Sequence, residues 1–142
     1  RLYFDPPQTP LPMAVVDAQK LSLAIVNLLE NAIRYNVKNG EVIVKVKPLE
    51  GRPFLEVSVK DTGIGIAPEA LQKLFTKFFR AENAVKFQTE GSGLGLYIAK
   101  NIIQAHGGEI RAESEPNRGS IFYFTLPTDP KLVPQREMPI EE

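Results

Sequence analysis

Residues 42–65 read VIVKVKPLEGRPFLEVSVKDTGIG, and this stretch decides the fold class. Apolar and polar side chains alternate over residues 42–47 and again over residues 55–60, which is typical of half-buried strands. The turn at Gly51-Arg52-Pro53 is short, so the two strands are expected to pair antiparallel. A sheet with one apolar side needs helices on that side to cover it.

Helical periodicity flanks this hairpin. Asp17 can cap a helix that reaches Asn36, Pro68 can open a second helix through Phe79, and a third spans about residues 94–105. Residues 110–126 then indicate a second hairpin. The predicted fold is α+β: a two-layer sandwich with three main helices on one face of a mixed, mostly antiparallel sheet.

Proline-rich segments mark both ends of the chain. Residues 1–12 are predicted to be an extended arm, residues 13–127 the domain, and residues 128–142 a tail or linker. The first residue is arginine and not methionine, which indicates a piece of a longer protein.

Composition excludes several kinds of chemistry. The 142 residues include no cysteine and one histidine, which excludes disulfides, thiolate zinc sites, a cysteine nucleophile and a multi-histidine metal centre. The 17 basic and 17 acidic residues cancel, which argues against nucleic acid or anionic lipid as a partner. No apolar run approaches the ~20 residues of a membrane helix.

Four polar or aromatic residues form one stripe on the first predicted helix: Asn27, Asn31, Arg34 and Tyr35. The stripe borders the apolar face, where a pocket wall would lie. An amide oxygen is a suitable ligand for Mg²⁺, which keeps few protein ligands beside phosphates and water. The alternative is a solvated helix face with an ordinary Glu30–Arg34 ion pair.

Strand alternation places Asp61 on the inward side, at the end of its strand. A buried carboxylate needs donors, and the exocyclic amine of adenine is one that fits. Gly63 and Gly65 could let a flat ring approach the backbone. The alternative is a plain turn in which Asp61 accepts from local amides.

Glycines at positions 91, 93 and 95 open the third predicted helix. Free amides at a helix N-terminus suit phosphate, although this pattern is neither a P-loop nor a dinucleotide fingerprint. The polar residues 81–92 before them indicate either a mobile lid or a connecting loop. His106 stands at the end of the same helix, where a histidine commonly interacts with the helix dipole.

The order of these motifs resembles the ATP-binding catalytic domain of sensor histidine kinases, in the superfamily of gyrase, heat-shock chaperones and mismatch-repair ATPases. The likeness covers about residues 10–127. Its motifs are residues 27–35 (NLLENAIRY), 61–66 (DTGIGI), 74–80 (LFTKFFR), 91–96 (GSGLGL), 106–108 (HGG) and 119–127 (GSIFYFTLP).

This resemblance implies an ATP site and assigns Mg²⁺ to Asn31. Asn27, Asn31 and Arg34 take the catalytic positions, with arginine standing where the family usually has lysine. The implied ATP-binding residues are Asn27, Asn31, Arg34, Tyr35, Asp61, Gly63, Gly65, Ile66, Phe75, Arg80, Gly91, Ser92, Gly93, Leu94, Gly95 and Leu96.

One departure bears on mechanism. Gyrase-like and chaperone-like members carry a glutamate at the position of Asn27, and that glutamate activates water for hydrolysis. The asparagine amide cannot do so, because it does not accept a proton at neutral pH. The resemblance therefore implies a cytoplasmic module that binds ATP and hydrolyses it poorly. It would phosphorylate a histidine on a separate dimerisation domain of the same protein, which then serves a response regulator receiver domain. The isolated fragment is expected to be monomeric, and the parent protein either membrane-anchored or free.

Three other functions stay open at this point. An anti-sigma-factor-type serine kinase uses the same ATP site on another acceptor, and an ATP-binding module without phosphotransfer would keep the same motifs. An aspartic protease would share the Asp61-Thr62-Gly63 signature but needs a second carboxylate and leaves the asparagine stripe unexplained.

Overall fold

The computed structural model describes residues 1–79 and 94–134. Five strands form one sheet in the order β1-β2-β3-β5-β4, in which β1 runs parallel to β2 and every other neighbouring pair is antiparallel. The strands are β1 (Leu2–Asp5), β2 (Val42–Pro48), β3 (Phe54–Asp61), β4 (Ile110–Glu115) and β5 (Gly119–Pro127). Both predicted hairpins are confirmed.

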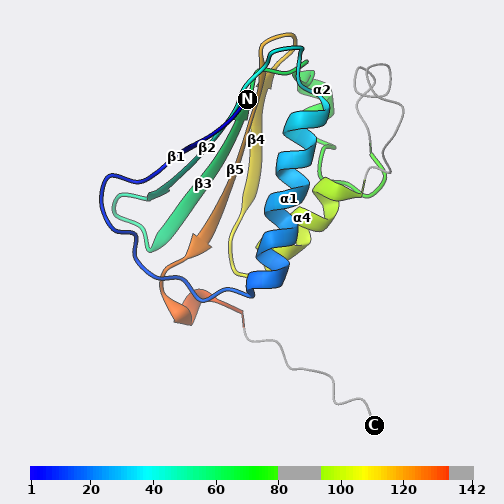
Figure 1. Ribbon diagram of the computed structural model, residues 1–142. Helices are drawn as coiled ribbons and strands as arrows, with labels where there is room; N and C mark the ends of the chain where they lie inside the picture. Colours follow the sequence, from blue (N-terminus) through cyan, green and yellow to red (C-terminus); the bar gives the residue numbers. More distant parts are fainter. Residues whose placement is uncertain (80–93, 135–142) are drawn as a thin grey trace.

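Helices cover one face of this sheet (Figure 1). They are α1 (Ala18–Arg34), α2 (Pro68–Leu71) and α4 (Gly95–Ala105), and a short 3₁₀ turn, η1 (Pro130–Leu132), follows the last strand. Asp17 caps α1 by accepting the Lys20 N–H on Oδ1 at 3.1 Å, and Gly107 ends α4 with φ +84°. The predicted α+β sandwich is confirmed.

The core lies between the central strands and the helix pair α1–α4. Phe122 and Phe124 of β5 are at most 1% exposed, and Leu28 of α1 and Ile103 of α4 are fully buried against them. The same core includes three small buried residues of these helices: Ala24, Ala32 and Ala99. Burial of one phenylalanine, leucine or isoleucine side chain stabilises the fold by about 1.5–3 kcal/mol.

The N-terminal segment corrects the prediction of an arm over residues 1–12. Leu2–Asp5 pair with Val42–Lys45 as an edge strand of the sheet, although all four side chains stay exposed. Backbone pairing and an exposed ion pair between Asp5 and Lys45 at 3.6 Å therefore hold β1, and a pattern based on side-chain burial does not reveal it.

The phenylalanine-rich segment corrects a second prediction, that of a helix from Pro68 through Phe79. The α-helix ends at Leu71, and i→i−3 turns follow, for example from the Thr76 N–H to the Lys73 carbonyl at 3.0 Å. Phe78 is not helical, because its φ is +64°, and the residue is 62% exposed.

The segment after β5 is only partly described by the structure. Of the predicted tail, residues 135–142 lie outside the described residues, whereas η1 follows β5 directly. Among the described residues, no helix has both the length and the apolar character needed to cross a bilayer.

Candidate functional site

The stripe on α1 forms as the sequence predicts. Asn27 and Asn31 are half-buried, Arg34 is exposed, and Tyr35 is the C-terminal cap of the helix. The alternative Glu30–Arg34 pair is absent from the ion pairs of the described residues, in which Arg34 has no partner. The guanidinium is therefore available to an anion.

Asn27 meets the start of α4. A Cβ atom at position 95 would lie 3.6 Å from Oδ1 of Asn27, so the asparagine side chain packs directly beside Gly95. Within the part of the chain that the structure describes, Asn27 Nδ2 is the one fully buried side-chain polar atom without a hydrogen-bond partner. An orphaned donor of this kind costs about 1–3 kcal/mol unless a ligand or water accepts from it.

Asp61 ends β3 on the inward side, and the residue is 6% exposed. Its Oδ1 accepts the backbone N–H of Gly63 at 2.9 Å and that of Ser120 at 3.2 Å. Oδ2 has no hydrogen bond from the described residues, yet it is not among their fully buried unpartnered atoms. One oxygen is thus fixed by the backbone and the other is left to accept from a ligand.

The loop after Asp61 is bonded to two other elements. The Ile64 N–H donates to the Tyr35 carbonyl at 3.0 Å, which joins the loop to the end of α1. The Asn117 N–H donates to the Ile64 carbonyl at 2.7 Å, which joins it to the β4–β5 turn. Asp61 therefore lies where α1, β3 and this turn meet.

The two glycines of the loop are required by protein contacts. A Cβ at position 63 would lie 2.4 Å from the Tyr35 carbonyl oxygen, and one at position 65 would lie 2.0 Å from the Glu115 carbonyl oxygen. Gly65 also has φ +73°. Close packing of the loop gives a reason for both glycines that does not depend on a bound ring.

Two serines behind the loop were missed by sequence reasoning. Ser114 Oγ accepts the Ile66 N–H at 2.8 Å, lies 2.8 Å from Ser120 Oγ and donates to the Gly119 carbonyl at 2.8 Å. The available signal was strand alternation, since both serines fall on the inward face, where apolar residues prevail.

The remaining predicted residues are core residues, a helix cap, and residues outside the described ranges. Phe75 packs edge-on against Phe122 with ring centroids 6.2 Å apart, while Ile66 and Leu96 also pack against the core. Leu94 is the N-terminal cap of α4 and makes no side-chain cap bond. Arg80, Gly91, Ser92, Gly93 and the predicted lid over residues 81–92 lie outside the described residues.

His106 is buried, and both of its ring nitrogens have hydrogen-bond partners. Its Nδ1 lies 2.8 Å from the Ile102 carbonyl oxygen, and its Nε2 accepts the Asp17 N–H at 3.0 Å. A carbonyl only accepts, so Nδ1 carries the proton and the ring is neutral. His106 is the C-terminal cap of α4, as the sequence predicts, and it also links the end of α4 to the start of α1.

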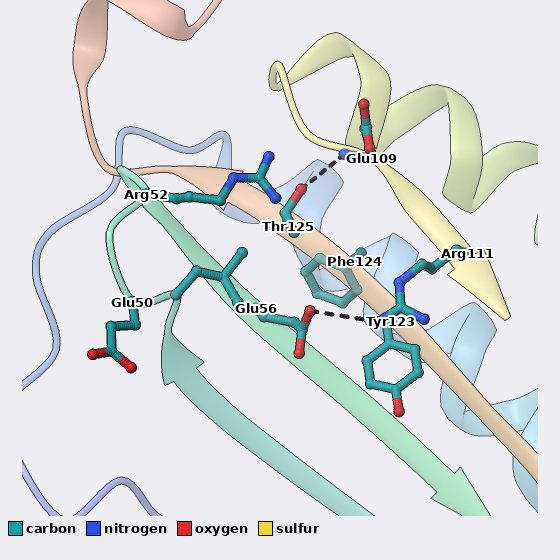
Figure 2. Close-up of a pocket in the computed structure, with 9 residues that line it drawn as sticks. Glu50, Arg52, Glu56, Glu109, Arg111, Tyr123, Phe124 and Thr125 are labelled. Atoms are coloured by element: carbon teal, nitrogen blue, oxygen red, sulfur yellow. Dashed lines mark hydrogen bonds and ion pairs between the residues drawn. The ribbon is translucent and has the colours of Figure 1, made fainter. Parts of the chain in front are cut away.

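A shallow hollow of about 230 Å³ lies on the opposite face of the sheet (Figure 2). Arg111 lies 3.9 Å from the Tyr123 ring centroid and pairs with Glu113 at 2.6 Å and with Glu56 at 3.9 Å. The Arg111 guanidinium is thus shared between two carboxylates and stacked on a tyrosine ring, so its charge is already paired within the protein.

A family model described as "Histidine kinase-, DNA gyrase B-, and HSP90-like ATPase" matches residues 16–130. The chain belongs to this family. The sensor histidine kinase WalK of Bacillus subtilis (strain 168) is 39% identical over 112 residues, 79% of this chain and 18% of WalK. This ATPase-family chain spans only 18% and 22% of the first two curated relatives it matches.

Solved histidine kinases share the fold. The catalytic domain of ThkA has a TM-score of 0.76 at 30% identity, over 92% of this chain and 80% of that one. ThkA in complex with the response regulator protein TrrA has a TM-score of 0.71 at 27% identity, over 92% and 34%. Full-length ShkA in complex with AMPPNP has a TM-score of 0.73 at 30% identity, over 89% and 25%.

Burial makes stability depend on Asp61 ionisation. Desolvation raises the pKa of Asp61, against the lowering effect of the hydrogen bonds from Gly63 and Ser120. Because the pKa of Asp61 is higher in the folded state, ionisation of this residue lowers the free energy of unfolding. This loss is absent below the unfolded-state pKa and complete above the folded-state pKa. Asp61→Asn should therefore gain stability relative to the unmutated chain as pH rises from about 4 to 7.

Urea unfolding at several pH values measures this difference. Thr62→Ala is the control, because it changes the neighbouring exposed residue without removing a titrating group. The difference in free energy of unfolding between this variant and the unmutated chain should stay constant with pH. A constant difference for Asp61→Asn would contradict the assigned effect of burial.

Proposed function

We propose that this domain binds Mg-ATP and donates the γ-phosphoryl group to a histidine on a separate dimerisation domain of the same protein. The observation that carries the proposal is the Asn27 amide, packed against Gly95 with a buried donor that has no partner. This donor suits a phosphate oxygen or a bound water beside the phosphates. The same position holds no carboxylate that could activate water for hydrolysis.

Adenine is assigned to the Asp61 end of the site. Oδ2 of Asp61 would accept from the exocyclic amine while Oδ1 stays held by Gly63 and Ser120. Gly63, Gly65 and Ile66 form the loop at the ring, and Tyr35 and Phe75 are assigned to the surrounding walls. The AMPPNP bound to full-length ShkA supports an adenine nucleotide as the ligand.

The phosphates are assigned to α1 and the start of α4. The Asn31 side chain fits Mg²⁺, because an amide oxygen is a hard ligand on the half-buried face beside Asn27. Bound Mg²⁺ would neutralise phosphate charge. The unpaired Arg34 would contact phosphate oxygens, and the N-terminal amides of α4 at Leu94, Gly95 and Leu96 would bind anions. Arg80, Gly91, Ser92 and Gly93 keep their predicted roles around the phosphates.

The proposed transfer step needs a nucleophile from another domain. An imidazole nitrogen forms a bond to the γ-phosphorus as the bond to the β,γ-bridging oxygen breaks, and ADP leaves with that oxygen. The imidazole proton passes to a base on the neighbouring domain. His106 does not suit the acceptor role, because it is 6% exposed and both ring nitrogens have partners.

A response regulator receiver domain is the proposed next acceptor, supported by the solved complex of ThkA with TrrA. We place the domain in the cytoplasm as part of the same proposal, and we expect the isolated chain to be monomeric.

The decisive test is phosphotransfer from γ-labelled Mg-ATP. The chain should transfer label to a histidine-bearing helical segment of its parent protein as acid-labile, alkali-stable phosphate. Acid-stable label on serine would support the serine-kinase alternative. ATP binding without transfer to any such segment would support a binding module, and either result overturns the proposal.

Replacing Asp61 by asparagine should weaken ATP binding without unfolding the domain. The amide preserves size and can still accept from Gly63 and Ser120, but its NH₂ group would face the adenine amine donor to donor. A hydrogen bond to a charged group contributes ~1.5–3 kcal/mol, so Kd should rise about ten- to a hundredfold in calorimetry. Asp5→Asn, on an exposed strand, is the control; equal affinity in Asp61→Asn would refute the adenine assignment.

Replacing Asn27 by glutamate tests the missing base. The unmutated chain should turn over ATP slowly, and Asn27→Glu should hydrolyse it faster, by up to about 10²–10⁴-fold if the carboxylate reaches water as a general base. Asn27→Gln matches glutamate in length but supplies no base, so it should stay slow. Rapid hydrolysis by the unmutated chain or by Asn27→Gln would contradict this account.

A further inference from the structure

Ser114 lies behind the nucleotide site, on the inward face of β4 and beside Ser120 in the sheet register. Three partners surround its hydroxyl oxygen, each at 2.8 Å: the Ile66 N–H, the Gly119 carbonyl oxygen and Ser120 Oγ. Ile66 belongs to the loop that follows Asp61, and Ser120 holds Asp61 Oδ1 through its N–H at 3.2 Å. One hydroxyl therefore joins both sides of the proposed adenine pocket.

The chemistry of these partners determines the direction of each hydrogen bond. An N–H can only donate and a carbonyl can only accept, so Ser114 accepts from Ile66 and gives its single proton to Gly119. Ser114 has no proton left for Ser120. The Ser120 hydroxyl must therefore donate to Ser114, and Ser120 Oγ can only accept from any other group that approaches it.

We propose that Ser114 is a positioning residue that makes the pocket wall at Asp61 and Ser120 accept only, and that this favours adenine over guanine. The inference rests on the proposed function of the same site. Ser114 does not touch the nucleotide in this account. It acts through the Ser120 hydroxyl proton and through the Ile66 amide.

The two purines differ in the group that this wall would meet. Adenine carries an exocyclic amine with two N–H donors, where guanine carries the O6 acceptor. Asp61 Oδ2 and Ser120 Oγ are both acceptors, so they suit the amine directly or through a water, and they leave guanine O6 facing lone pairs. If Ser120 were free to turn its proton outward, part of this discrimination would disappear.

The test compares Mg-ATP and Mg-GTP binding to the 142-residue chain by calorimetry. Ser114→Ala should weaken ATP binding about three- to tenfold, the effect of one hydrogen bond, and should lower the ratio of ATP to GTP affinity. Ser114→Thr keeps the hydroxyl and should restore both. Ser58→Ala, a serine at a half-buried position elsewhere in the sheet, is the matched control and should change neither.

A second variant keeps the test valid if Ser114→Ala does not fold. Ser120→Ala removes the hydroxyl whose proton is in question while leaving Ser114 bonded to Ile66 and Gly119, and it should also lower the ATP-to-GTP ratio. Where both single variants fold, the double variant should lower the ratio no further, because the ratio depends on the hydrogen bond between Ser120 and Ser114, which either variant removes.

The outcomes separate this inference from the proposed function. Unchanged ATP affinity and ratio in Ser114→Ala, or equal losses for ATP and GTP with a lower Tm, would overturn the positioning role and indicate a purely structural one. An unchanged ratio in Ser120→Ala would also overturn it. Failure of the unmutated chain to bind ATP would instead refute the proposed function.

Discussion

Burial of one carboxylate, that of Asp61, is the constraint on which the site depends. An ionised group taken out of water costs several kcal/mol unless donors replace the lost hydration. The backbone N–H groups of Gly63 and Ser120 supply them, both to Oδ1. The first requires a tight loop directly after β3, and the second requires β5 beside β3 with Ser120 opposite Asp61, which is the observed register. The hydrogen bonds that replace the lost hydration of this carboxylate therefore require the observed register of β3 and β5.

The constraint extends from the sheet to the helices. The loop that donates to Asp61 also donates, through Ile64, to the Tyr35 carbonyl at the end of α1. At the other end of α1, the His106 ring accepts the Asp17 N–H and ties the helix to the end of α4. Because α1 is bonded at both ends, the stripe between them is placed relative to both Asp61 and Gly95. The positions that we propose for adenine and for the phosphates are thus coupled through one helix.

Sequence patterns predicted the elements whose formation depends on burial. Alternation found β2 through β5 and placed Asp61 inward, and helical spacing found α1 and α4. Strand β1 was missed because its four exposed residues are held by backbone pairing. The helix through Phe79 was wrong because i→i−3 turns follow Leu71 and Phe78 takes a left-handed conformation. Ser114 was missed because its contacts with Ile66 and Ser120 depend on tertiary packing of the loop after Asp61 against the β4–β5 hairpin, although strand alternation placed it on the inward face.

The Asn27 amide explains why such a site would separate binding from chemistry. A glutamate at this half-buried position would carry a base to the phosphates, but it would also place a second carboxylate in the site and favour hydrolysis. Asparagine keeps a polar group for the ligand at the cost of an unpartnered donor. In the described residues, the histidine that could otherwise accept a proton is committed to Ile102 and Asp17. In the function that we propose, a domain built in this way would hold ATP intact until another domain supplies both nucleophile and base.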